Sequence, residues 1–185
     1  IKGIESDPKY AWAGPRVIGP DGKEQGPWCR IDLKTYAITY GVLYPFTYKY
    51  RRKIEKDRTK SGCILRPMGA FMLLKNVPIS NVSFFDEGTF VYAEESILLE
   101  KLLKNNYMFY YCGIVRILHQ HEKTTSTLFH NERQKLISIM KSDLYYFNKY
   151  RNYNKLECFM AALGKLMYIL IYRPLIAKTK KFLSS

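Results

Sequence analysis

The sequence FFDEGTFVYAEE at residues 84–95 ends an aromatic loop with two adjacent carboxylates, Glu94 and Glu95. After them, apolar side chains recur with helical spacing at Ile97, Leu98, Leu102 and Leu103. Three charged side chains of the same segment are expected to face solvent: Glu100, Lys101 and Lys104. The stretch predicts a loop and then an amphipathic helix, whose positive N-terminus favours the acidic pair in its first turn.

Downstream of this helix the sequence predicts a strand and then a histidine. Asn105 and Asn106 suit a helix end, because asparagine tolerates the left-handed conformation of a helix cap. Residues 107–118, YMFYYCGIVRIL, indicate one buried strand or two short ones. His119 follows directly, 24 positions after Glu95.

Upstream of the acidic pair, the sequence predicts short strands separated by turns. Residues 11–18, AWAGPRVI, indicate an apolar strand interrupted at Gly14-Pro15, and PDGK at residues 20–23 is a strong turn signal. Residues 28–60 are expected to form a long irregular loop, and the sequence does not decide whether this loop contains a helical turn. Residues 63–74, CILRPMGAFMLL, predict a strand, a backbone break, and then a buried strand or helix start.

Charge is unevenly distributed over the 185 residues, whose formal net charge is +14. Residues 131–185 hold 11 Lys/Arg against 3 Asp/Glu, a net +8, and residues 1–130 hold 19 against 13, a net +6. Residues 49–60 form a basic run with 7 basic and 2 acidic side chains. Such clusters favour polyanions, although a solvated loop explains the run equally simply. The shift near residue 131 predicts two regions, 1–130 and 131–185.

The basic region 131–185 is expected to be helical. Glu132–Tyr150 and residues 155–172 both show helical patterns, and Arg173-Pro174 is expected to interrupt the second. Its apolar core, residues 158–172, would span about 22 Å as a helix, which is short of a ~30 Å hydrocarbon core. The sequence therefore favours a buried or interfacial helix at an anionic membrane surface. Packing against this protein or a partner subunit is the alternative.

The four cysteines Cys29, Cys63, Cys112 and Cys158 are widely scattered. No pair has the spacing of a metal clip or a redox motif, so four reduced thiols in a cytosolic protein are expected. The chain also has no phosphate-binding glycine loop and no nucleophile elbow. Without a helix-turn-helix or zinc-finger pattern either, nucleic acid is not an expected partner.

Two sets of side chains are candidates for chemistry. Glu94 and Glu95 point about 100° apart on a helix, so one of them can act as a base while the other binds a ligand or holds local structure. The alternative is that they serve only as capping charges, as adjacent glutamates at a helix start often do. His119 and His121 would share one face of a strand, a spacing that suits a metal ion but also arises by chance.

Five segments, taken in order, resemble the C-terminal half of a family 2 glycosyltransferase of the bacterial rhamnosyltransferase and galactofuranosyltransferase-like kind. They are GPRVI with DGK and Gln25 (residues 14–25), GAFML (69–73), FDE through Phe90, Tyr92 and Glu94-Glu95 (85–95), a helix with Lys101 at a basic position (98–107), and His119. The match covers roughly residues 8–127. It implies an α/β fold: the C-terminal half of a GT-A (nucleotide-diphospho-sugar transferase) domain, a mixed sheet with flanking helices, here with an α-helical basic tail.

The resemblance also implies roles for individual residues. Glu95 matches the catalytic base, which takes a proton from the acceptor hydroxyl as that oxygen attacks the anomeric carbon with inversion. Glu94, Gly69, Ala70 and Phe71 match acceptor-binding positions, with Gly69 and Ala70 allowing close approach of substrate to the backbone. His119 matches a ligand of Mn²⁺ or Mg²⁺, an ion expected only together with an N-terminal half that carries an acidic metal-binding motif.

This sequence departs from the family pattern in two ways. The usual aspartate base is Glu95 here, and a further aspartate of the family is replaced by Ile97. Residues 1–12 hold no acidic metal-binding motif, so the chain alone is expected to transfer no sugar.

The leading hypothesis is therefore an inverting glycosyltransferase segment that takes a nucleotide-sugar donor and a saccharide or lipid-linked acceptor in cell-surface polysaccharide synthesis. It would be cytoplasmic and peripheral at the inner face of the cell membrane. The alternatives are a non-catalytic basic module that binds membrane or nucleic acid, and a catalytically inactive scaffold. Homo-oligomerisation stays open.

Overall fold

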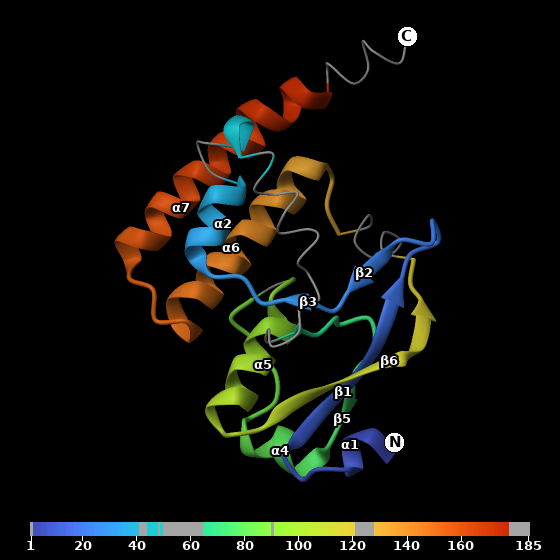
Figure 1. Ribbon diagram of the computed structural model, residues 1–185. Coiled ribbons are helices and arrows are strands. Elements are labelled where there is room, and N and C mark those ends of the chain that lie inside the picture. Colours follow the sequence, from blue (N-terminus) through green and yellow to red (C-terminus); the bar gives the residue numbers. More distant parts are fainter. Residues whose placement is uncertain are drawn as a thin grey trace. The chain divides into compact units, whose positions relative to one another are not determined.

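The computed structural model describes residues 2–40, 44–47, 49, 65–89, 91–120 and 128–177 (Figure 1). The chain divides into two compact units, one of residues 1–30 with 59–130 and one of residues 31–58 with 131–185. The boundary after residue 130 falls at the change in composition. The division also assigns residues 31–58 to the second unit, which the sequence did not predict.

The first unit is built on a mixed sheet centred on strand β1 (Tyr10–Ile18). Strand β6 (Met108–Leu118) runs parallel along one edge of β1, and strands β2 (Glu24–Gly26) and β5 (Leu73–Leu74) pair antiparallel along the other. A separate two-stranded sheet pairs β3 (Trp28–Cys29) with β4 (Leu65–Arg66). Together with short helix α1 (Lys2–Glu5) and two further helices, this confirms a mixed α/β fold (Figure 1).

Strand β1 is continuous, so the expected interruption at Gly14-Pro15 is wrong. The irregularity lies in its partner: Pro15 pairs with Cys112 and the next residue, Arg16, pairs with Arg116. Three residues of β6 therefore bulge out of the ladder where proline offers no N–H group. The bulge exposes Ile114, and much of β6 is half-buried or exposed rather than buried as predicted.

One face of the sheet packs against helices α4 (Asn76–Asn81) and α5 (Glu94–Lys104). The core between them contains Ala11, Trp12, Ile79, Val82, Leu98 and Leu102. Helix α5 begins and ends where the sequence predicts, with Asn105 at its C-cap and Asn106 in the left-handed region at φ 62°.

Glu100 does not face solvent as predicted. It is buried, and its Oε1 accepts from Arg30 Nη1 at 2.7 Å. The reason is helical spacing, because a residue three positions after the buried Ile97 lies on nearly the same side of α5.

The second unit is helical. It contains α2 (Leu33–Tyr40), the 3₁₀ turn η1 (Tyr44–Phe46), α6 (Glu132–Tyr150) and α7 (Lys155–Met167). Helix α7 packs against both α2 and α6, and the Tyr36 and Phe147 rings meet edge to face at 5.4 Å between centroids. The predicted helix at 132–150 is confirmed, with Asn131 as its N-cap.

The expected break at Arg173-Pro174 is wrong. A π-helical turn, η2 (Tyr168–Tyr172), follows α7, and residues 173–177 continue as α-helix. The wider π turn directly before Pro174 makes room for the proline ring. Lys155–Ala177 is thus one 23-residue helical stretch, long and apolar enough to cross a membrane by length and composition alone. The expectation that this helix is too short to span a membrane is therefore wrong.

The cysteines also differ from expectation. Cys29 is disulfide-bonded, whereas Cys112 and Cys158 are free thiols. The expectation of four reduced thiols is therefore wrong. Disulfide pairing depends on how closely two cysteines approach in space, which sequence spacing does not reveal.

Candidate functional site

The loop between α4 and α5 is held at its start by a lysine of α5. Ser83 and Phe84 both lie in the left-handed region, at φ 58° and 50°. Lys101 Nζ donates to their two carbonyl oxygens, at 3.2 Å and 2.7 Å respectively. Asp86 Oδ1 then accepts from the Gly88 amide at 2.6 Å. Lys101, at the basic position of the resemblance, therefore anchors the loop that carries the FDE sequence.

The same loop ends in strained backbone immediately before the acidic pair. Tyr92 and Ala93 have φ values of 71° and 69°, a conformation that costs a residue with a side chain on the order of 1 kcal/mol. Ala93 is the N-cap of α5, and it has no side chain that could cap the helix. Glu94 and Glu95 occupy the first turn, both half-buried, where the helix N-terminus favours negative charge.

Two buried polar atoms flank Ala93. Tyr92 Oη and Glu94 Oε2 have no hydrogen-bond partner within the part of the chain that the structure describes. Leaving a buried polar atom unsatisfied costs about 1–3 kcal/mol, so such atoms normally pair with protein, water or a bound ligand. A hydroxyl and a carboxylate oxygen together suit a ligand that both donates and accepts hydrogen bonds, as sugar hydroxyls do.

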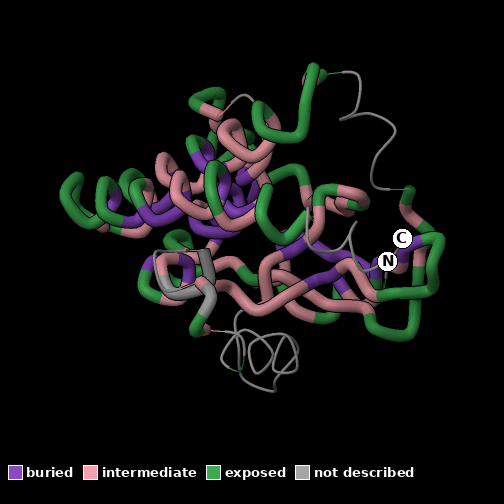
Figure 2. The backbone as a smooth tube through the Cα atoms, turned by 90° about the horizontal axis from the view of Figure 1, so that it is seen from above, coloured by how far each residue is buried: buried purple, intermediate pink, exposed green. Residues whose placement is uncertain are grey.

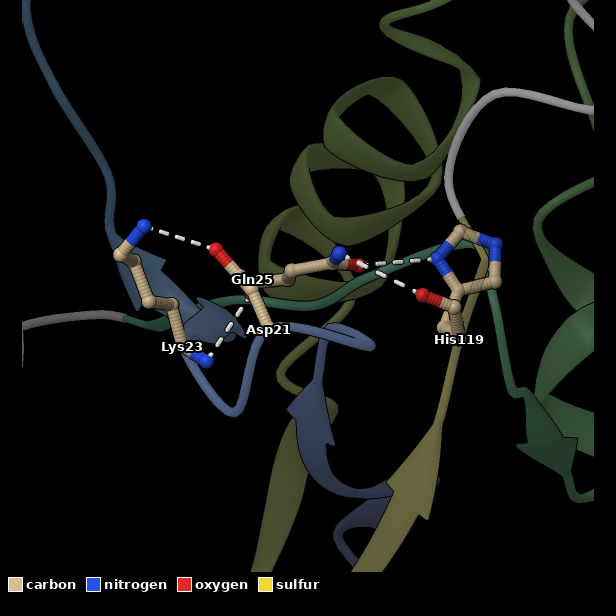
Figure 3. Close-up of polar contacts among 4 residues, drawn as sticks. All are labelled: Asp21, Lys23, Gln25 and His119. Carbon is tan, nitrogen blue, oxygen red and sulfur yellow. Dashed lines mark hydrogen bonds and ion pairs between the residues drawn. The ribbon is translucent and has the colours of Figure 1, made fainter.

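At the opposite end of β6, His119 is paired with Gln25. His119 Nδ1 lies 3.0 Å from Gln25 Oε1, and Gln25 Nε2 donates to the His119 carbonyl oxygen at 3.3 Å (Figure 3). The second bond orients the amide so that its oxygen faces the ring, and Nδ1 must therefore carry the proton. In the neutral ring the lone pair then belongs to Nε2, the arrangement seen in metal-binding histidines.

The DGK turn lies beside this pair in sequence and in space. Gly22 has φ 74° in the β1–β2 turn, and Lys23 Nζ donates to Asp21 Oδ2 at 2.8 Å (Figure 3). The hydrogen bond from Lys23 holds the pKa of Asp21 below its ordinary value. The predicted turn at residues 20–23 is confirmed. The structure also brings DGK, Gln25 and His119, three parts of the resemblance that are up to 98 positions apart, to one end of the sheet.

The fit of Mn²⁺ or Mg²⁺ to this end of the sheet is partial. His119 is correctly oriented to be one ligand. Within the described residues no group of three or more His, Cys, Asp or Glu side chains is close enough to hold a metal ion. Any further ligands would have to come from outside the described residues.

The acceptor-binding candidates of the GAFML segment lie in the turn before β5. Gly69 is exposed, Ala70 is half-buried and Phe71 is 45% exposed. A Cβ atom added to Gly69 would meet no atom within 4 Å, so packing within the described chain does not require glycine there. Phe71 lines an apolar pocket of about 220 Å³ on the sheet, together with Pro15, Leu73 and Tyr110.

The structure does not bring all candidates into one cavity. The pocket that Phe71 lines includes neither Glu94, Glu95 nor His119. The prediction that the Glu95 carboxylate and the His119 imidazole share a cavity stays a prediction. Phe90, His121 and all of the basic run except Lys49 lie outside the described residues.

Sequence reasoning missed two features of this region. It placed Glu100 on the solvent face, and it gave Tyr92 no role of its own. Helical spacing from Ile97 could have revealed the first. Nothing in the sequence indicated the positive φ of Tyr92, because left-handed backbone is common at glycine and asparagine and rare at tyrosine.

Comparisons with known proteins found no match. No protein-family model, no curated protein and no solved structure matches the chain.

Proposed function

We propose that the first unit is the acceptor-side part of an inverting glycosyltransferase with a GT-A type catalytic domain. It would transfer a sugar from a nucleotide-sugar donor to a saccharide or lipid-linked acceptor. The observation that carries the proposal is the start of α5, where Tyr92 Oη and Glu94 Oε2 are buried without a hydrogen-bond partner among the described residues and Glu95 is the next residue. The mixed sheet and the clustering of DGK, Gln25 and His119 support it further.

In this proposal Glu95 is the general base. The acceptor hydroxyl oxygen attacks the anomeric carbon of the donor while its proton passes to the Glu95 carboxylate. The bond from the anomeric carbon to the nucleotide diphosphate breaks on the opposite side, so the configuration inverts. Glu94 and Tyr92 hold neighbouring acceptor hydroxyls through hydrogen bonds, and this positioning supplies much of the rate.

Lys101 and the strained loop preorganise this site. The Lys101 ammonium fixes the loop start through two carbonyl oxygens, and the loop end enters α5 with Tyr92 and Ala93 in left-handed backbone. A loop held at both ends keeps the carboxylates in place before substrate binds.

A divalent Mn²⁺ or Mg²⁺ ion would neutralise the departing diphosphate when bound. His119 would contribute Nε2 to it, with Gln25 fixing the ring through Nδ1. This role gives Gln25 a reason to be where it is.

The test is a transfer assay on the complete protein with a panel of nucleotide sugars and with saccharide and lipid-phosphate-linked acceptors. We expect a glycosylated product by mass spectrometry whose new linkage has the anomeric configuration opposite to that of the donor by NMR. Retention of configuration would contradict the proposal, as would an absence of transfer while the protein binds both substrates.

A second function, membrane binding without catalysis, is supported by the exposed apolar side chains of the second unit. It differs from the first in one measurable respect. Membrane binding does not require Glu95, so replacing that residue would leave membrane binding unchanged.

A further inference from the structure

The helical stretch 155–177 has an exposed apolar stripe on its outer face. Its inner face is buried and contains Cys158, Ala161, Gly164, Lys165 and Ile169. The stripe consists of Leu156, Phe159, Met160, Leu163, Leu170, Ile171 and Leu175. Figure 2 shows this alternation of buried and exposed residues along the helices.

The stripe is too extensive to be ordinary surface. Leu156, Phe159 and Met160 are 70%, 57% and 60% exposed, and they lie on one side of a single helix with the other members. A helix that is apolar on both faces requires a second apolar environment, and contiguous exposed patches mark interaction sites.

Two arginine side chains lie at the C-terminal end of the stripe. A pocket of about 430 Å³ between the start of α6 and the end of the helix is lined by Arg133 and Arg173, with apolar walls from Leu136, Leu170 and Pro174. Arg173 Nη2 pairs with Glu132 Oε1 at 2.9 Å, so the two guanidinium groups and one carboxylate leave a net positive charge there. Leu170 belongs to both the pocket and the stripe.

Charge and chemistry together favour one occupant. Residues 131–185 carry a net charge of +8, so a second copy of the chain would bring like charge against like charge. An anionic bilayer provides binding groups for both features of this surface, namely acyl chains for the stripe and phosphates for the arginines. The inner face of the helix packs against α2 and α6 within its own unit, so the helix would lie along such a bilayer rather than across it.

We propose that residues 155–177 lie in the boundary between headgroups and acyl chains of an anionic membrane, with the stripe facing the lipid and Arg133 and Arg173 binding lipid phosphates. This inference does not depend on Glu95 or on sugar transfer.

The test is flotation of the complete protein with phosphatidylcholine vesicles and with vesicles that also contain phosphatidylglycerol. We expect strong binding only to the second kind. Replacing Phe159, Met160 and Leu163 with serine should weaken it roughly a hundredfold. Arg133→Gln with Arg173→Gln should weaken it roughly tenfold and reduce its salt dependence. A matched control replaces the exposed apolar Ile114 and Leu118 of the first unit with serine, which should change nothing.

A measurement on the wild-type chain guards against variants that fail to fold. Hydrogen–deuterium exchange should slow at residues 155–177 when anionic vesicles are added, and not in α5. Unchanged exchange there, or equal binding by the serine variant and the wild type, would overturn the proposal. So would a concentration-dependent dimer in sedimentation velocity that the serine variant abolishes, because the stripe would then join two copies.

Discussion

Gln25 and His119 are joined through both the amide and the ring: Gln25 Oε1 faces His119 Nδ1 at 3.0 Å, and Gln25 Nε2 donates to the His119 carbonyl oxygen. The two residues are 94 positions apart and meet where β6 ends, beside strand β2 and the end of β1. The contact assigns the Nδ1–H tautomer to the neutral ring.

Replacing Gln25 with alanine should allow the neutral His119 ring to adopt both tautomers. We expect long-range ¹H–¹⁵N spectra of the neutral wild-type protein to show Nδ1–H for His119 and a mixture of tautomers in Gln25→Ala. The exposed His130 serves as the control within the same spectra and should not respond. An Nε2–H ring in the wild type would contradict the contact and remove His119 as an Nε2 metal ligand.

The ion pair between Arg30 and Glu100 should be important for stability. Its side chains are only 22% and 7% exposed, so Arg30→Met leaves a buried carboxylate without its guanidinium. We expect the free energy of unfolding to fall by on the order of 3 kcal/mol in denaturant titrations. Lys9→Met, at an exposed position of the same unit, should change it by less than about 0.5 kcal/mol. Equal effects would show that the pair contributes no more than a surface contact.

Lys165 should make the stability of the second unit depend on pH. Burial lowers its pKa to about 8, although Asp143 acts in the opposite direction and Arg173 lowers it further. Its ammonium also lies 5.2 Å from the Tyr36 ring centroid. The unfolded chain keeps this proton up to about pH 10.5, so it binds more protons than the folded chain between about pH 8 and that value. Stability should therefore rise with pH across this window.

Lys165→Met should remove that rise and increase the free energy of unfolding at neutral pH by on the order of 2 kcal/mol. The matched control is Lys141→Met, at an exposed position of α6, which should keep the wild-type slope. If both variants have the same pH dependence in denaturant titrations, Lys165 is not the group responsible.

The cysteines should differ in reactivity. In denatured, unreduced protein, iodoacetamide should modify Cys112 and Cys158 but not Cys29, which should react only after reduction. In the native protein Cys158 should react more slowly than Cys112, because burial raises the pKa of its thiol and leaves little thiolate. Labelling of Cys29 without reductant, read by peptide mass spectrometry, would contradict the disulfide.

Local patterns predicted several of the regular elements, although not helix α2 (Leu33–Tyr40) within the expected loop of residues 28–60. The helix at Glu94–Lys104, its asparagine stop, the turn at 20–23 and the helix at Glu132–Tyr150 all follow from periodicity and capping, which are short-range properties. The errors involve tertiary context. A π turn carried the last helix through Pro174, the bulge in β6 left Gly14-Pro15 inside a continuous strand, and Glu100 found a buried partner 70 positions away.

The candidate site shows the same limit. The order of the motifs identified Glu94, Glu95 and His119 as candidates, and the structure placed His119 in contact with Gln25, another residue of those motifs. What no pattern could show is that Tyr92 and Ala93 adopt left-handed backbone and that, among the residues the structure describes, a buried hydroxyl and carboxylate oxygen near Glu95 have no hydrogen-bond partner. These depend on how the loop from residue 83 to 93 is held by Lys101, which is a three-dimensional property.

The most direct test of the central claim is the rate of sugar transfer by Glu95→Gln in the complete protein, measured in single turnovers beside donor affinity. Glu87→Gln, an exposed glutamate of the same loop, is the matched control. We expect a loss of at least about a hundredfold in the transfer rate for Glu95→Gln with donor binding unchanged, and wild-type behaviour for Glu87→Gln. Transfer by Glu95→Gln at the wild-type rate would contradict it.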